Sequence, residues 1–149
     1  MLIRRARKED LQALAAMEAG HPGYPAWGEP GLAAELGKNF SVTLIAEADG
    51  RPAGFMNFWV LKPQIQLNSL VVSAQALRTG VASALIGELE EYAKKSACHE
   101  VDLEVNERNA PALTLYGKLG FKVAGRRPKF YNNSDAAILM RKTLWRKND

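Results

Sequence analysis

Three apolar, strand-like segments follow one another in the middle of the sequence, and only short turns separate them. They cover Phe40 to Glu47, Pro52 to Leu61 and Ile65 to Val72. Asp49-Gly50 is a hairpin signal between the first two, and Lys62-Pro63-Gln64 turns the chain into the third. Strands joined by such tight turns run antiparallel. The pattern therefore argues against a doubly wound parallel sheet.

Helical and strand-like patterns alternate on both sides of this block. We expect further strands at Leu2–Ala6, Val101–Val105, Phe121–Phe130 and Ala136–Leu144, and helices at Asp10–Ala19, Leu32–Leu36, Ala82–Lys95 and Pro111–Leu119. The glycine- and proline-rich stretch from His21 to Gly31 predicts a loop, one that is unusually aromatic because it carries Tyr24 and Trp27. The order predicts an α+β fold in which helices pack on a mostly antiparallel sheet.

The size and composition predict one globular domain over residues 1–149, since 47% of the residues are hydrophobic and 24% are charged. The single cysteine, Cys98, allows no internal disulfide, and no signal peptide or apolar span of about 18 residues is visible. We therefore expect a cytoplasmic protein without a membrane partner. His21, His99 and Cys98 do not form a metal-binding pattern, and Cys98 is interpreted as a buried apolar residue rather than a nucleophile.

Basic residues gather in two groups near the end of the sequence, and two interpretations are open. The groups are Arg126, Arg127 and Lys129, and then Arg141, Lys142, Arg146 and Lys147. Such residues can bind nucleic acid or a phosphorylated cofactor, or they can form a solvated face with a basic tail. Aromatic residues do not interleave the tail as a nucleic-acid platform requires, so no specific nucleic-acid partner is predicted.

The stretch from Ser69 to Lys95 carries the first functional signal. A strand leads through a short loop into Arg78, Thr79, Gly80, Val81, Ala82 and Ser83, where an amphipathic helix starts. A helix N-terminus offers unpaired backbone N–H groups and a positive dipole end, and Gly80 has no Cβ to keep an anion away. The loop predicts a pyrophosphate cradle, although a plain capped helix remains an alternative. It matches neither a Walker loop nor a dinucleotide fingerprint.

Three segments resemble the GNAT family of N-acetyltransferases. The run Arg78 to Ala82 resembles the family's acetyl-CoA pyrophosphate loop, with Leu77 where the motif usually begins with Gln or Arg. Leu103 to Phe121 is similar to its strand-helix segment, and Pro128 to Leu144 resembles the last two strands of protein N-terminal acetyltransferases, above all the ribosomal-protein-alanine (RimI-type) enzymes. The resemblance implies a mixed, mostly antiparallel sheet of about seven strands with helices on both faces, acetyl-CoA as the acetyl donor, and no metal. Leu77 lacks the polar side chain that the motif usually has at this position. Since the loop binds the pyrophosphate mainly through backbone N–H groups, we expect this difference to weaken cofactor affinity at most.

The resemblance also implies roles for individual residues. Glu104 corresponds to the general base and Tyr116 to the acid that protonates the leaving thiolate. From the residues alone, the spacing favours an ordinary exposed strand carboxylate at Glu104, and Tyr116 can be a core tyrosine. Asn109 could cap its helix, bind the pantetheine arm, or do both. The backbone of Leu70, Val71 and Val72 resembles the strand that pairs with the pantetheine amides and supplies the oxyanion donor.

The acceptor is expected to be the N-terminal amine of a protein or peptide, possibly a ribosomal protein. Tyr24 and Trp27 on one side and Tyr131 on the other resemble the two walls of a peptide groove. A small amine, such as an aminoglycoside, a polyamine or an amino acid, is the alternative acceptor. A non-catalytic module that binds CoA or nucleic acid is a remote third possibility, because it would need neither Glu104 nor Tyr116.

Overall fold

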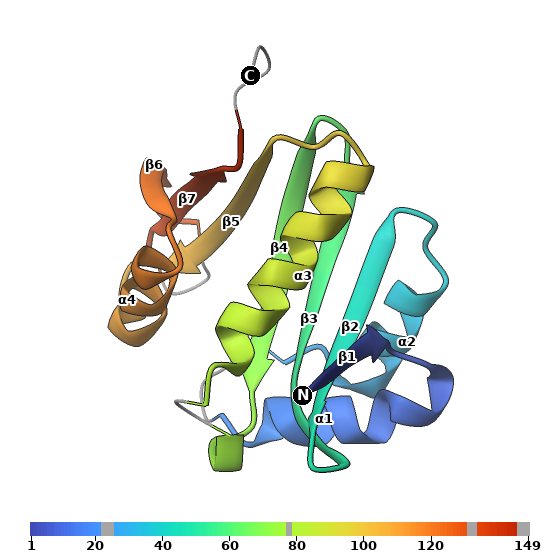
Figure 1. The fold of residues 1–149 in the computed structure, drawn as a ribbon. Helices are drawn as coiled ribbons and strands as arrows, with labels where there is room; N and C mark the ends of the chain where they lie inside the picture. The colour runs from blue at the N-terminus through green and yellow to red at the C-terminus, as the bar shows by residue number, and fades with distance from the viewer. Residues whose placement is uncertain (22–25, 77–78, 131–133, 146–149) are drawn as a thin grey trace.

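The computed structural model describes residues 1–21, 26–76, 79–130 and 134–145, which form one seven-stranded sheet with helices on both faces (Figure 1). The strands are β1 (Leu2–Arg5), β2 (Ser41–Ala48), β3 (Arg51–Leu61), β4 (Gln64–Val72), β5 (Glu100–Asn106), β6 (Lys122–Arg127) and β7 (Ala137–Thr143). The helices are α1 (Leu11–Ala19), α2 (Gly28–Leu36), α3 (Val81–Lys95) and α4 (Ala110–Lys118), with short 3-10 turns η1 (Lys8–Asp10) and η2 (Ala74–Ala76).

The sheet has the spatial order β1-β2-β3-β4-β5-β7-β6. Every neighbouring pair is antiparallel except β4 and β5, which run parallel because α3 connects them. This confirms the mixed, mostly antiparallel sheet that the sequence predicted. The hairpin signal is also confirmed, since Asp49 and Gly50 both adopt the positive φ angles, 52° and 75°, that a tight turn between β2 and β3 requires.

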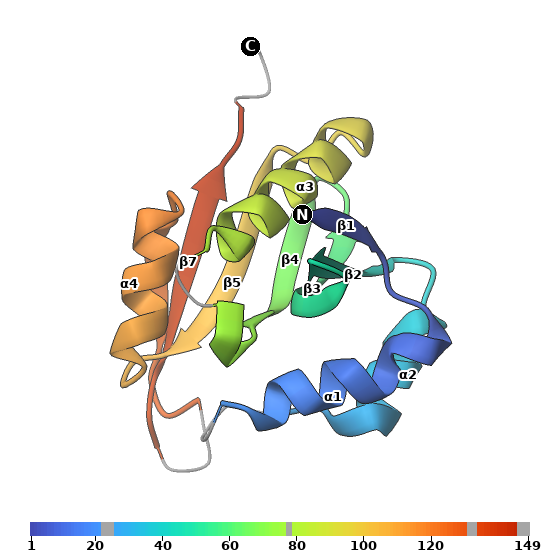
Figure 2. The same ribbon diagram turned by 60° about the horizontal axis from the view of Figure 1, so that its bottom comes forward.

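Alternating side chains of the sheet build two separate cores. Ile45, Phe55 and Val71 face α1 and α2, where they pack against Leu14 and Leu32. Their neighbours along each strand, Leu44, Met56 and Leu70, face the opposite way and pack toward α3 and α4. Leu103 and Val105 of β5 belong to this second core. Figure 2 shows α1 and α2 below the sheet and α3 above it, with α4 at the left beside β7. The expected helices on both faces are confirmed.

Two element boundaries differ from the expectation by three residues or more. Helix α2 starts at Gly28 instead of Leu32, because the buried carboxylate of Glu18 accepts hydrogen bonds from the backbone N–H groups of Trp27 (2.9 Å) and Gly28 (3.1 Å). Glu18 thereby caps the helix from the end of α1, the preceding helix. Strand β6 ends at Arg127 instead of Phe130, since Pro128 has no N–H to donate and Lys129 adopts a positive φ of 54°.

Strands β4 and β5 pair over only part of their length. Their register runs from Gln64 opposite Glu100 to Gln66 opposite Asp102, although β4 continues to Val72 and β5 to Asn106. The two strands diverge beyond this point, toward the N-terminal end of α3 (Figure 1). We call Leu67–Val72 and Leu103–Asn106 the β4/β5 fork. In the described part of these strands, the backbone edges of β4 and β5 that face each other across the fork form no strand pairing with each other.

Candidate active site

The N-terminal end of α3 is built to accept an anion. Gly80 is its N-cap residue in a left-handed conformation (φ 84°), and its side-chain position opens onto space without a neighbour within 4 Å. Among the described residues no side chain caps this helix end, and its first turn carries no acidic residue. Thr79, Gly80 and Ser83 are exposed, whereas Val81 is a core residue that can offer only its backbone. Arg78, the predicted fixed charge, lies outside the described residues.

Gly54 on β3 holds this helix end against the sheet, and the sequence analysis did not single it out. A Cβ atom at position 54 would lie 2.8 Å from the carbonyl oxygen of Val71 and 2.8 Å from Cγ1 of Val81. The start of α3 therefore approaches β3 more closely than any side chain at position 54 would permit. A glycine inside a strand pattern is the signal that could have identified it.

The backbone of β4 presents alternate residues to the fork. The N–H of Ser73 donates to the carbonyl of Ala53 on β3, so the backbone of Val72 points the other way, toward the fork. The imidazole Nε2 of His21 lies 2.5 Å from the Val72 carbonyl oxygen and places this residue at the same edge. By the same alternation Leu70 faces the fork and Val71 pairs with β3. Two of the three predicted backbone positions thus face the opening.

A β-bulge marks the place where β4 leaves β5. The register of β3 and β4 passes from Asn57–Ser69 to Phe58–Leu67, which leaves Asn68 as the additional residue. The Asn68 side-chain amide donates to Oδ1 of the fully buried Asn57 (3.0 Å). Asn57 in turn donates to Oγ of Ser41 and Oγ1 of Thr43, each at 2.9 Å. This network ties the bulge to β2.

The network ends on the buried carboxylate of Glu35 in α2. Oε1 of Glu35 accepts hydrogen bonds from Oγ of Ser41 and Nε1 of Trp59, each at 2.7 Å, and Oε2 accepts one from Lys38. Burial alone would raise the pKa of Glu35, but the hydrogen bonds from Lys38, Trp59 and Ser41 outweigh it and hold the pKa below its ordinary value. Glu35 is therefore a charged anchor for the α2 side of the sheet.

The two predicted catalytic side chains lie on opposite faces of the sheet. Glu104 stands between Leu103 and Val105, which both point into the α3/α4 core, so Glu104 projects toward the α1/α2 face. Tyr116 lies on α4, on the other face, where its ring contacts Phe121 edge-on at a centroid distance of 5.7 Å. The fork lies between these two faces. Tyr116 is partly buried, so its core-packing role holds whether or not it also acts on a thiolate.

Arg127 on β6 is the charged partner of Glu104. Its Nη1 atom lies 3.4 Å from Oε1 of Glu104, and its guanidinium lies over the ring of Phe130 at 5.5 Å from the centroid. The Glu104 side chain is 26% exposed and the Arg127 side chain 57% exposed, so the pair is open to solvent on one side. The sequence analysis grouped Arg127 with the basic residues and did not connect it to Glu104.

Other residues of the basic groups also contact carboxylates. Arg141 binds both oxygens of Asp102, at 2.7 and 2.9 Å, and the hydrogen bond to Asp102 raises the pKa of Arg141 further. The remaining pairs are Arg126 with Glu107 at 3.1 Å and Lys142 with Glu90 at 3.0 Å. Much of the basic charge is thus neutralised locally, as expected of a solvated face.

Asn109 and Trp27 occupy structural positions. The Asn109 side-chain oxygen accepts a hydrogen bond from the N–H of Ala112 (3.2 Å), which confirms the predicted cap of α4. Trp27 precedes α2 and packs against the α1/α2 core, while the predicted partners Tyr24 and Tyr131 lie outside the described residues. Whether Asn109 also binds a cofactor and Trp27 a peptide stays a prediction.

Two other features of the described residues bear on function. No group of three or more His, Cys, Asp or Glu side chains there could hold a metal ion. Cys98 is buried, and burial raises the pKa of its thiol, which disfavours the nucleophilic thiolate. Separately, no helix in the described part of the chain combines the length and the apolar character that crossing a membrane requires.

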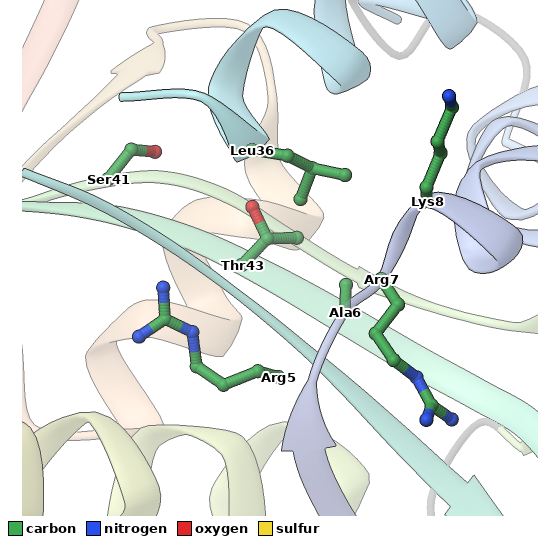
Figure 3. A pocket seen from close by; sticks show the side chains of 7 residues that line it. All are labelled: Arg5, Ala6, Arg7, Lys8, Leu36, Ser41 and Thr43. Carbon is green, nitrogen blue, oxygen red and sulfur yellow. The ribbon is translucent and has the colours of Figure 1, made fainter. Parts of the chain in front are cut away.

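A hollow of about 320 Å³ lies far from the fork, between β1, η1, the end of α2 and β2. Arg5, Arg7 and Lys8 line it, but their charged ends point in different directions (Figure 3). The hydroxyls of Ser41 and Thr43 face it while already bonded to Asn57. Because β3 and β4 separate this hollow from β5, it is not part of the site that carries Glu104.

Comparison with known proteins agrees with this geometry. The model of the acetyltransferase (GNAT) family matches residues 4–121, which include the fork, the start of α3, Glu104 and Tyr116. The chain belongs to this family. It is an acyltransferase that uses acetyl-CoA. The glycine at the N-terminus of α3, the helix start that no described side chain caps, and the strand edges of the fork that no ladder joins fit that cofactor.

Individual relatives extend the family assignment. The [ribosomal protein bS18]-alanine N-acetyltransferase of Escherichia coli K12 is 31% identical over 137 residues, which cover 88% of this chain and 89% of that protein. The crystal structure of the ribosomal-protein-S18-alanine N-acetyltransferase from Escherichia coli has a TM-score of 0.84 at 25% identity and covers 99% of this chain and 97% of its own. An aminoglycoside 6'-N-acetyltransferase complexed with coenzyme A has a TM-score of 0.82 at 17% identity, with both chains covered completely. The fold itself is thus shared with an enzyme named for a different kind of acceptor.

Proposed function

We propose that this GNAT protein transfers the acetyl group of acetyl-CoA to the N-terminal α-amine of a protein or peptide. The observation that carries the proposal is the placement of Glu104 on the α1/α2 face and of Tyr116 on the opposite face, with the fork between them. This separation suits acyl transfer, because the attacking amine and the leaving sulfur occupy different positions on the reacting carbon, so that the base and the acid must reach them from different directions. The E. coli relative named for the alanine terminus of a ribosomal protein supports this acceptor class.

In this proposal the cofactor lies along the fork. The backbone N–H groups of Val81, Ala82 and Ser83 would bind its pyrophosphate, assisted by Thr79 and Arg78. The edge of β4 at Leu70 and Val72 would pair with the pantetheine amides, and Asn109 would contact the same arm. When bound, acetyl-CoA supplies the thioester whose acetyl group is transferred.

The protein's own groups then act at three atoms. Glu104 accepts a proton from the amine, which must be neutral when it attacks. A backbone N–H at the edge of β4 donates to the carbonyl oxygen as negative charge develops there. Tyr116 gives its phenolic proton to the departing sulfur, a task that fits a hydroxyl with an ordinary pKa of about 10.

An α-amine is the acceptor that suits a single carboxylate base. Its pKa is about 8, so about a tenth is neutral at pH 7, whereas a lysine amine with a pKa of about 10.4 is only about 0.04% neutral. The position of Arg127 agrees, because a guanidinium beside the base repels the additional charges of a polyamine or an aminoglycoside. Trp27, with Tyr24 and Tyr131, would form the walls of the peptide groove.

The test is a thiol-release assay with three sets of acceptors. The first set has a free N-terminus and no lysine, the second has a blocked N-terminus and one lysine, and the third contains a polyamine and an aminoglycoside. We expect turnover with the first set. Turnover with the second or third set alone would overturn the proposed acceptor, and thiol release with none of them would favour a binding module.

A further inference from the structure

The guanidinium of Arg127 reaches Glu104 across an intervening strand. Glu104 on β5 lies opposite Leu139 on β7, and Leu139 lies opposite Gly125 on β6. Gly125 carries no side chain, and the side chain of Leu139 packs over it on this face, since a Cβ atom at position 125 would lie 3.2 Å from Cδ1 of Leu139. Arg127 lies two residues further along the same face of β6, and its guanidinium reaches Glu104 across β7. The guanidinium of Arg127 also lies over the ring of Phe130, and this cation–π contact helps to fix its position.

We infer that Arg127 recognises the first carbonyl oxygen of the acceptor peptide while Glu104 accepts the proton of the α-amine. The inference rests on the proposed function, since it assumes an α-amine acceptor. In any amino acid residue the amine nitrogen and its own carbonyl oxygen are about 2.7–3.6 Å apart, as standard bond lengths and angles dictate. The two protein atoms that would bind them, Oε1 of Glu104 and Nη1 of Arg127, are 3.4 Å apart. An acceptor residue can therefore lie alongside the pair and bond to both members at once.

The charges of the pair match this acceptor and few others. Glu104 only accepts hydrogen bonds, as an amine donor requires, and Arg127 only donates, as a carbonyl oxygen requires. A lysine side chain carries its amine six bonds away from the nearest backbone carbonyl carbon, and a polyamine has no carbonyl. Arg127 would thus select an α-amine over an ε-amine, in addition to the difference in their pKa values.

The test replaces Arg127 and compares two peptides that differ by one methylene. One lysine-free peptide begins with alanine, and the other begins with β-alanine, which moves the carbonyl one carbon further from the amine. Arg127→Gln removes the charge, and Arg127→Lys keeps it without the guanidinium geometry. Arg126→Gln is the matched control, because Arg126 is the next residue on β6, is similarly exposed (56%), and pairs with Glu107 instead.

We expect Arg127→Gln to lower kcat/KM for the alanine peptide by about 10-fold to 100-fold, the range of a lost charge-assisted hydrogen bond. The preference for the alanine peptide over the β-alanine peptide should shrink by a similar factor, measured by turnover or, for a slow peptide, by competitive inhibition. Arg127→Lys should fall between the wild type and Arg127→Gln, and Arg126→Gln should match the wild type. The dissociation constant for acetyl-CoA should not change in any variant.

Two results would overturn the inference and leave the proposed function standing. One is an unchanged preference in Arg127→Gln with equal losses on both peptides, which would mean that Arg127 acts only through Glu104. The other is wild-type activity of Arg127→Gln on the alanine peptide. If the wild type acetylates neither peptide but does acetylate a small amine, the proposed function fails, and the inference fails with it.

Discussion

Replacing Gly54 with alanine should damage both stability and acetyl-CoA binding. The added methyl group would lie 2.8 Å from a backbone oxygen on β4 and 2.8 Å from a side-chain carbon of Val81, so these groups must move by several tenths of an ångström. Strand pairing between β3 and β4 holds the carbonyl oxygen of Val71 in place, so the start of α3 must move away from the sheet instead. Overpacking of this kind costs about 1–3 kcal/mol, and for a chain of this length each kcal/mol lowers Tm by about 2–4 °C.

The same displacement should weaken the cofactor site, because Val81 begins the helix whose N–H groups would bind the pyrophosphate. Losing one hydrogen bond to a charged group corresponds to about a 10-fold to 100-fold rise in the Kd for acetyl-CoA. Thermal unfolding and titration calorimetry measure the two effects. Gly87→Ala is the control, since Gly87 lies on the exposed side of α3 without a neighbour within 4 Å, and an alanine there should raise stability by about 0.8–1.0 kcal/mol. A Gly54→Ala protein with the wild-type Tm and Kd would refute the claim that this close approach positions the helix.

Three further predictions concern single side chains. Gly80→Asp should abolish acetyl-CoA binding in calorimetry, because it places an anion where a phosphate would lie; wild-type affinity would put the cofactor elsewhere. Glu104→Gln and Tyr116→Phe should each lower kcat by about 10²–10⁴-fold while the Kd for acetyl-CoA holds, and wild-type rates in both would refute the roles proposed for them. The folded-state pKa of Glu35 lies below its unfolded value, so its carboxylate stabilises the protein above the unfolded pKa of about 4.3, and this contribution is lost as pH falls through the folded-state pKa. Thermal melts of Glu35→Gln should therefore show a Tm deficit at pH 7 that narrows below pH 4, and a deficit independent of pH would contradict the assigned charge.

Much of the fold could be predicted from local sequence patterns. The strands of the β2–β3–β4 block were found to within a residue or two, because alternating apolar side chains and the Asp49-Gly50 turn are local signals. Asn109 marked the start of α4 for a similar reason, since its side chain bonds to the backbone three residues later. Local chemistry suffices where the partners are close in sequence.

The start of α2 could not be predicted, because its stabilising partner lies in the preceding helix, beyond the three or four residues that a capping motif spans. Gly28, Pro30 and Gly31 are all typical of loops, yet the carboxylate of Glu18 caps the helix across the loop between α1 and α2. Pro30 is tolerated because it lies in the first turn, where its missing N–H has no helical partner.

The candidate site also combines residues that sequence patterns indicate with contacts that only the fold reveals. Glu104 and Tyr116 were proposed from the family resemblance, and their placement on opposite faces of the sheet became visible only in three dimensions. Arg127 is 23 positions from Glu104 in the sequence, and the bulge anchor Asn57 lies on a different strand from the fork. Such contacts depend on strand order and register, which no local pattern encodes.

The central claim, that the acceptor is an N-terminal α-amine, is tested most directly within a single molecule. A peptide with a free N-terminus and one internal lysine is incubated with acetyl-CoA and the protein, and tandem mass spectrometry locates the added acetyl group. We predict that the α-amine carries it, with a trace at most on the lysine. Acetylation mainly on the lysine side chain would contradict the account.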